Sequence, residues 1–291
     1  MNSKLRNITT LARPIVLILM VLLLQSAFTS CNSNKIYLIV RGDDMGKNFC
    51  RTEGFIKSFE EGILRSASIM ATAVYFDEAV KYCKDHPELA AGIHITLADG
   101  TQRPVLSPEE VPSLVNAKGF FFESADEIEN PSEEEMEKEI RAQVKKARES
   151  GLHFVYLDWH RGVPPAAEQI IAKVCEDEKL IYGPTEALSE YGFTRVSLLK
   201  GENFPSVVLP DGQKAYYGGP ANSTENEEAF YEGLSNLKPG KWITVIHPGW
   251  GDPNRASTTK ILCSERTKEI INKKNIKLMN YNDLWTKEFG K

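Results

Sequence analysis

The sequence lacks several signals that would assign a function quickly. None of its five cysteines forms a CxxC pair, which argues against a cysteine-based zinc module or a thioredoxin-type redox site. No basic run is present, and 35 Lys/Arg against 40 Asp/Glu give a formal net charge of −5, so nucleic-acid binding is not expected. No apolar run approaches the roughly 20 residues of a transmembrane helix. The remaining composition, 42% hydrophobic and 26% charged, is that of an ordinary globular protein.

Residues 1–30 predict a lipoprotein signal peptide. A basic start precedes an unbroken apolar run at 15–24, which is too short to span a bilayer but suits the core of a signal peptide. Small residues then lead to Cys31. We therefore expect cleavage before Cys31, a membrane anchor through lipid on its thiol, and a place in the bacterial cell envelope, at the periplasmic or outer-membrane face. Ordinary secretion with an incidental Cys31 is the alternative.

Residues 31–291 predict a single α/β domain. Short apolar runs rich in β-formers alternate with stretches of helical spacing, which indicates parallel strands covered by outer helices. We expect one (β/α) barrel, irregular or incomplete, with an open doubly wound sheet as the alternative. The dinucleotide-binding form of that sheet is disfavoured because no GxGxxG follows Val40. Two disulfides or buried free thiols are both open for the cysteines after Cys31.

The expected elements follow from the spacing of apolar residues and from Gly, Pro and capping signals. Strands are predicted at 36–40, 68–72, 92–97, 154–157, 242–246 and 277–279. Helices are predicted at 52–61, 76–83, 166–177, 227–237 and 264–272, and between Ser132 and Gly151. Residues 98–130 and 181–225 are expected to be irregular.

Polar residues gather where predicted strands end. In a parallel barrel the carboxyl ends of the strands lie on one face, where catalytic residues collect. Three of the five histidines occupy such ends, a placement that core packing alone does not explain. Each residue by itself could be a cap or a buried hydrogen-bonding group, but together they predict a metal site. The residues are Asp43 and Asp44, His94, Asp158 and His160, and His247.

These residue types suit metal-assisted hydrolysis. One carboxylate and two imidazoles give three ligands and leave positions for water and substrate, so we expect Asp44, His94 and His160 to hold one divalent ion. A metal there can lower the pKa of water and polarise a carbonyl oxygen. Asp43 then fits as the general base and His247 as the acid. Two imidazoles favour Zn²⁺ over Mg²⁺, although the metal is left open.

The same motifs, in this order, resemble the YdjC-like (ChbG) carbohydrate deacetylase family over residues 36–285. The motifs are Asp43-Asp44-Met45-Gly46, Ser66 to Met70, Gly92-x-His94-x-x-Leu97, Asp158-x-His160, His247-Pro248-Gly249 and Arg266 to Glu269. The resemblance implies a (β/α)-barrel hydrolase that removes N-acetyl groups from amino-sugar oligosaccharides or polysaccharides with Zn²⁺ or Mg²⁺. It gives Asp44, His94 and His160 the role of metal ligands. It makes Asp43 the base and His247 the acid-side histidine.

Two departures from the family pattern bear on the substrate. The family often has Asn-Ala where this chain has Arg41-Gly42, and commonly has a further histidine where it has Arg161-Gly162. The arginines are consistent with a negatively charged sugar or with salt bridges, and both stay open. The expected partner is an N-acetylated oligosaccharide, and a homodimer is left open. The alternative functions are a glycan-binding lipoprotein with a catalytically silent barrel, or another metal-dependent esterase or phosphoesterase.

Overall fold

The computed structural model describes residues 34–199, 206–208, 214–216, 224–252 and 255–290. Residues 36–291 form one compact unit. The predicted signal peptide and Cys31 lie outside the described residues. Among the described helices, none is both long enough and apolar enough to cross a membrane.

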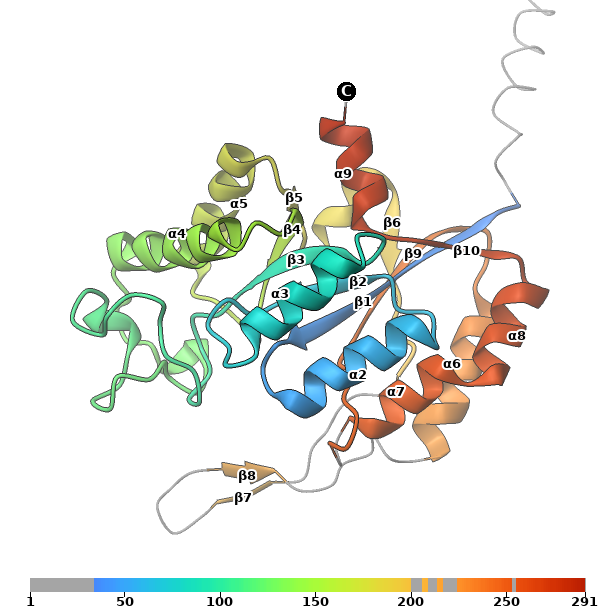
Figure 1. The fold of residues 1–291 in the computed structure, drawn as a ribbon, viewed down its shortest axis with the longest axis horizontal. Coiled ribbons are helices and arrows are strands. Elements are labelled where there is room, and N and C mark those ends of the chain that lie inside the picture. Colours follow the sequence, from blue (N-terminus) through green and yellow to red (C-terminus); the bar gives the residue numbers. More distant parts are fainter. Residues whose placement is uncertain (1–33, 200–205, 209–213, 217–223, 253–254, 291) are drawn as a thin grey trace, which may run out of the picture. The chain divides into compact units, whose positions relative to one another are not determined.

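Parallel strands form a central sheet (Figure 1). The strands are β1 (Ile36–Met45), β2 (Ser66–Ile69), β3 (Ala90–Ile95), β4 (Phe154–Trp159), β5 (Ile181–Tyr182), β6 (Phe193–Arg195), β9 (Gly240–Ile246) and β10 (Ile276–Met279). Their order is β5-β4-β3-β2-β1-β9-β6, with β10 paired to the first half of β1. No pairing joins β5 to β6 in the part of the chain that the structure describes, so the barrel is incomplete. The predicted α/β class with parallel strands is confirmed.

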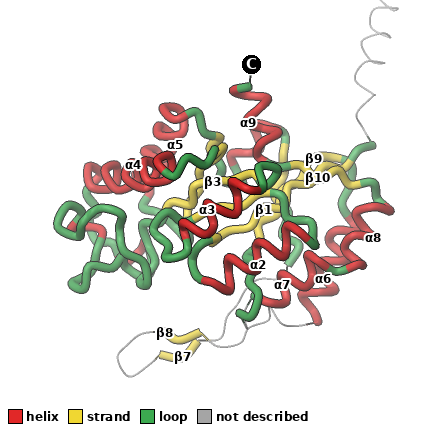
Figure 2. The backbone as a smooth tube through the Cα atoms, in the orientation of Figure 1, coloured by secondary structure: helices red, strands yellow, loops and turns green. Residues whose placement is uncertain are grey.

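Helices connect the strands and pack around the sheet (Figure 2). They are α2 (Phe49–Glu60), α3 (Phe76–Asp85), α4 (Glu133–Glu149), α5 (Pro165–Glu178), α6 (Thr224–Asn236), α7 (Ala256–Cys263), α8 (Glu265–Lys273) and α9 (Tyr281–Phe289). Short 3₁₀ helices lie at Pro112–Leu114, Ala125–Glu127 and Ala187–Tyr191, and β7 (Ser206–Val208) pairs antiparallel with β8 (Lys214–Tyr216). Helices α7 and α9 are not among the elements predicted from the sequence, and the expectation that 181–225 is irregular is wrong where β5, β6, β7 and β8 form.

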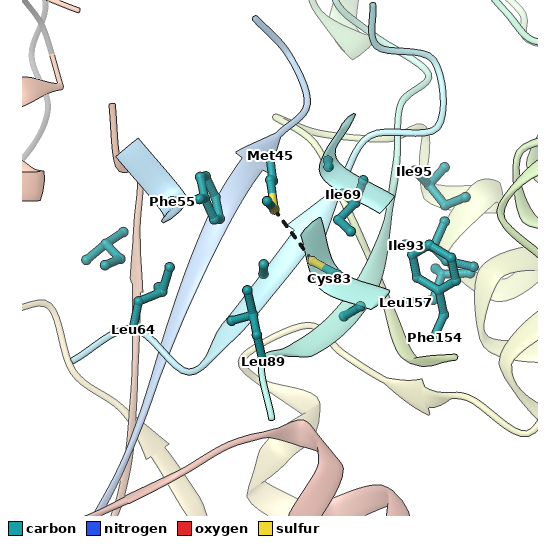
Figure 3. Close-up of a cluster of buried hydrophobic side chains, with 14 of the residues drawn as sticks. Met45, Phe55, Leu64, Ile69, Cys83, Leu89, Ile93, Ile95, Phe154 and Leu157 are labelled. Atoms are coloured by element: carbon teal, nitrogen blue, oxygen red, sulfur yellow. Dashed lines mark hydrogen bonds between the residues drawn. The ribbon is translucent and has the colours of Figure 1, made fainter. Parts of the chain in front are cut away.

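The alternation of side chains along β3 separates the core from the polar face. Ile93 and Ile95 lie in the main hydrophobic core with Leu157 of β4 (Figure 3). His94 lies between them and therefore points to the opposite face of the sheet. On that face Tyr281, the first residue of α9, stacks on Tyr156 of β4 with ring centroids 3.8 Å apart. Helix α9 thus covers part of the face that carries the polar residues.

The cysteines in the described part of the chain are free thiols, so the disulfide alternative does not hold for them. They are Cys50, Cys83, Cys175 and Cys263. The thiol of Cys83 packs in the core, with its Sγ 4.0 Å from Met45 Sδ (Figure 3). Burial raises the pKa of the Cys83 thiol to about 12, so it stays protonated and unreactive.

Candidate metal centre

An irregularity at the end of β1 sets the direction of the two adjacent aspartates. Strand β1 runs past Val40 to Met45, and its register against β2 shifts between Gly42 and Met45. Asp44 adopts φ 81°, a left-handed conformation that costs a non-glycine residue on the order of 1–3 kcal/mol. In a regular strand Asp43 and Asp44 would point to opposite faces. Here each has a carboxylate oxygen within 4.8 Å of a His94 nitrogen.

Asp44, His94 and His160 converge in a buried cluster. Asp44 Oδ1 lies 2.7 Å from His160 Nδ1 and 3.5 Å from His94 Nε2. The two imidazole rings have centroids 5.4 Å apart, and all three ligand atoms lie within 4.8 Å of one another. Asp44 Oδ1 is buried without a hydrogen bond to any described residue. An unsatisfied carboxylate oxygen facing two ring nitrogens is a donor set that suits a divalent cation.

Two further carboxylates hold the outer nitrogens of the imidazoles. Asp158 Oδ1 lies 2.8 Å from His94 Nδ1, and Asp99 Oδ2 lies 3.1 Å from His160 Nε2. Each contact leaves the other ring nitrogen directed at Asp44, which is the arrangement that orients histidine ligands in metalloproteins. Asp158 is one of the residues that the sequence places at the site, although it was not assigned as a ligand, base or acid, and Asp99 is not among them. The only signal in the sequence that could have indicated Asp99 is that an acidic residue follows shortly after the end of β3.

Cations compensate the buried carboxylates on the outer side of the cluster. Lys47 Nζ lies 2.6 Å from Asp99 Oδ2. Arg51 Nη1 lies 2.9 Å from Asp44 Oδ2, and its Nε lies 3.1 Å from Asp252 Oδ2. Lys47 and Arg51 sit in the loop after β1 and in the first turn of α2, so the segment that carries Asp44 also carries its counter-charges. Such pairing allows ionised carboxylates to remain ionised when buried.

The charges of the cluster determine its protonation. Burial raises the pKa of Asp44, but its contacts with His160 and His94 and the charge of His247 outweigh burial and hold that pKa well below the usual range. Burial lowers the pKa of His94, but the charge of Asp158, contacts with the carboxylates of Asp158 and Asp44 and the charge of Asp43 together outweigh burial and raise that pKa to about 10. Without a metal, the His94 ring is therefore protonated at neutral pH. A divalent ion must displace this proton to bind.

Asp43 lies beside the cluster in a hydrogen-bonded network that reaches His94 through Ser68 and Asp158. Its carboxylate is within 4.8 Å of ligand atoms of His94 and Asp158. Arg41 binds it through Nε at 2.9 Å, and Ser68 Oγ lies 3.2 Å from it. Arg41 is buried at 5% exposure, so of its two interpretations the structure favours the salt bridge over a contact with substrate. The departure at Arg161 is also salt-bridged, to Glu123 at the surface.

His247 follows β9 and lies at the same end of the sheet. It is half-buried, and its charge contributes to the lowered pKa of Asp44. The loop that carries it packs tightly on α2, since a Cβ at Gly54 would come within 2.3 Å of Gly249 Cα. Trp250 N also donates to Cys50 O at 2.7 Å. Glycine at position 54 therefore lets α2 fix the loop of His247 against the segment that follows Asp44.

The structure thus brings the five residues predicted as metal ligands, base and acid to one end of the sheet, together with Asp158. A family model described as YdjC-like protein matches residues 37–273. Relatives named carbohydrate deacetylase include proteins from Brevibacillus brevis (26% identical, 85% of this chain, 99% of the relative) and Enterococcus faecalis (29%, 87% and 99%). A solved protein from Enterococcus faecalis V583, named for cleavage of cellobiose phosphate, shares the fold with a TM-score of 0.67 and 23% identity over 86% of this chain and 99% of its own. The chain belongs to the YdjC-like protein family.

Proposed function

We propose that this protein is a metal-dependent hydrolase that removes N-acetyl groups from amino-sugar oligosaccharides or polysaccharides. The observation that carries the proposal is the buried cluster of Asp44, His94 and His160 with a second carboxylate, Asp43, beside it. The relatives named carbohydrate deacetylase, which are 26–29% identical over 85–87% of this chain, support the same activity.

The donor set fits one divalent ion. Asp44 Oδ1, His94 Nε2 and His160 Nδ1 would hold it, and the unsatisfied Oδ1 supports this assignment. When bound, a divalent ion supplies Lewis-acid polarisation of the amide carbonyl and makes water more acidic. Two nitrogen ligands favour Zn²⁺ or another transition ion over Mg²⁺.

The protein's own groups carry the proton transfers. Asp43 accepts a proton from the attacking water as the oxygen of that water forms a bond to the acetyl carbon. His247, from the β9 side, donates a proton to the amine nitrogen as the C–N bond breaks. The products are acetate and the free amino sugar. Arg51 and Lys47 hold the carboxylates of Asp44 and Asp99 in place while charge shifts within the site.

Acetate release tests this proposal. Chitooligosaccharides and other N-acetylated sugars are incubated with the purified protein, with and without a chelator, and the bound metal is quantified. We expect acetate release that stops on chelation and returns with added metal. No release from any acetylated glycan, with metal demonstrably bound, would contradict the deacetylase assignment. Faster turnover of acetyl esters or phosphoesters would favour the other hydrolase class, and glycan affinity without turnover would favour a binding protein.

We also propose that residues 1–30 are a signal peptide and that residues 31–291 form a lipid-anchored envelope protein. The motif before Cys31 supports this. The test is to express the full chain and its Cys31→Ala variant in a bacterial host and to separate membrane from soluble fractions. We expect detergent-dependent release of the wild type and loss of membrane association in the variant. Equal fractionation of the two proteins would contradict the anchor.

A further inference from the structure

We infer that Arg41 is the positioning residue of the site: it fixes the carboxylate of Asp43 in the orientation that proton transfer needs. The inference rests on the proposed function, because it takes Asp43 as the base of the deacetylation. The family pattern often has Asn at the position of Arg41, so an arginine is not an expected part of this site. Its contacts show what the arginine does here.

Arg41 binds Asp43 with a two-point contact. Its Nε lies 2.9 Å from Asp43 Oδ1, and its Nη2 lies 3.2 Å from Asp43 Oδ2. A planar guanidinium that meets both oxygens of a carboxylate fixes the plane of that carboxylate as well as its distance. Each oxygen keeps a lone pair that Arg41 does not use. The contact therefore orients Asp43 without closing it to a further proton.

The third nitrogen of the guanidinium ties this pair to the rest of the site. Arg41 Nη1 lies 3.0 Å from Asp158 Oδ2, 2.7 Å from Gly183 O and 3.1 Å from the hydroxyl of Tyr281. Asp158 in turn contacts His94 Nδ1. Arg41 thus links Asp43, the candidate base, to Asp158, the carboxylate that contacts the candidate metal ligand His94. The carbonyl oxygen of Gly183 accepts a hydrogen bond from the guanidinium and holds it in place.

Ser68 cannot replace Arg41 in this role. Its Oγ lies 3.2 Å from Asp43 Oδ1 and 2.8 Å from Asp158 Oδ2, but a hydroxyl has one proton and can donate to only one of them at a time. Arg41 donates two hydrogen bonds to Asp43 and at the same time forms an ion pair with Asp158. It also separates two like charges whose oxygens both lie within 4.8 Å of a His94 nitrogen. Without it, their repulsion would turn Asp43 away.

Arginine substitutions with chemical rescue test the inference. Arg41→Ala removes the cation, and Arg41→Lys keeps a charge but not the two-point contact. The matched control is Arg65→Ala, because Arg65 is a partly buried arginine that bonds backbone carbonyls of its own turn, including Gly62 O, and touches no site residue. Acetate release is measured as kcat and KM, metal affinity by titration of the metal-free proteins, and folding by thermal unfolding. Guanidinium chloride at millimolar concentration serves as the rescuing probe.

We expect kcat to fall about 100-fold in Arg41→Ala and at least tenfold in Arg41→Lys, with KM within threefold of wild type, because small displacements of a reacting group cost rates of this order. Added guanidinium should raise the kcat of Arg41→Ala at least tenfold and raise the thermal midpoint of its metal-free form. It should change neither quantity in the wild type or in Arg65→Ala. If Arg41→Ala does not fold, the kcat of Arg41→Lys decides.

Two results would overturn the inference while leaving the proposed function intact. One is a kcat within threefold of wild type in the folded Arg41 variants. The other is a loss of kcat that guanidinium does not restore and that parallels the loss of stability, which would indicate a structural role only. A wild-type protein that releases no acetate from any substrate would instead overturn the proposed function, and the inference with it.

Discussion

Removal of the Asp99 carboxylate tests the buried cluster as a metal centre. Asp99 Oδ2 lies 3.1 Å from His160 Nε2, and the other nitrogen of this ring lies 2.7 Å from Asp44 Oδ1. The ring is therefore held from both sides, with Nδ1 free of a proton when Nε2 donates to Asp99. Loss of such an outer partner weakens metal binding by about 10- to 100-fold, which corresponds to about 1.4–2.7 kcal/mol.

Both Asp99→Ala and Asp99→Asn should show this loss. Asp99 Oδ1 accepts from Thr101 N at 3.0 Å and from Thr101 Oγ at 2.7 Å, while Oδ2 faces His160 and Lys47. An asparagine has one acceptor oxygen in place of two. In one orientation of the asparagine side chain its NH₂ group faces the Lys47 ammonium, and in the other it faces the Thr101 N–H, so a donor meets a donor in both. The isosteric change thus does not preserve the site.

The assay is calorimetric titration of the metal-free proteins with Zn²⁺ at one pH. Asp126→Asn is the control, because Asp126 is exposed in the same long loop and the substitution makes the same change of charge. We expect the control to bind like the wild type. Metal affinity within threefold of wild type in both folded Asp99 variants would refute the role of Asp99 and weaken the case for a metal at His160.

Two further predictions concern protonation and packing. In the metal-free protein the pKa of His94 is raised to about 10, because the neighbouring carboxylates of Asp158, Asp44 and Asp43 together outweigh the effect of burial. The stability that the protonated ring contributes is complete below about pH 6.5 and is lost as pH rises through about 10, so the free energy of unfolding of the metal-free protein should fall over that range. For the same reason, metal binding at pH 8 should release about one proton, which calorimetry in buffers of different ionisation enthalpy measures; no release would contradict a protonated ring. Gly54→Ala places a Cβ 2.3 Å from Gly249 Cα, and we expect a loss of about 1–3 kcal/mol and a lower kcat. Gly162→Ala is the control, because a Cβ at Gly162 meets its nearest neighbour at 3.8 Å. Equal thermal midpoints for Gly54→Ala and the control would contradict the tight contact between Gly54 and Gly249.

The order of elements was largely predictable because each depends on local signals. The predicted strand at 154–157 is observed as Phe154–Trp159, and the helix expected after Ser132 begins at Glu133 with the Ser132 side chain as its cap. Helix α9 was missed although Asn280 and Asp283 form a reciprocal cap. That signal follows the last predicted strand closely, and the helix packs on the sheet through Tyr281, a contact that no local pattern contains.

By itself, the sequence determined that Asp43, Asp44, His94, His160 and His247 lie at or near the carboxyl ends of strands, and hence that they would share one end of a parallel sheet. This followed because the direction of parallel strands fixes where their carboxyl ends lie. Only the tertiary structure decided the contacts between segments far apart in the chain. Arg41 meets Asp158, and His160 meets Asp99, through side chains whose partners depend on strand register and on the path of a long loop. Period and spacing describe one segment at a time, so they cannot specify which distant charges pair.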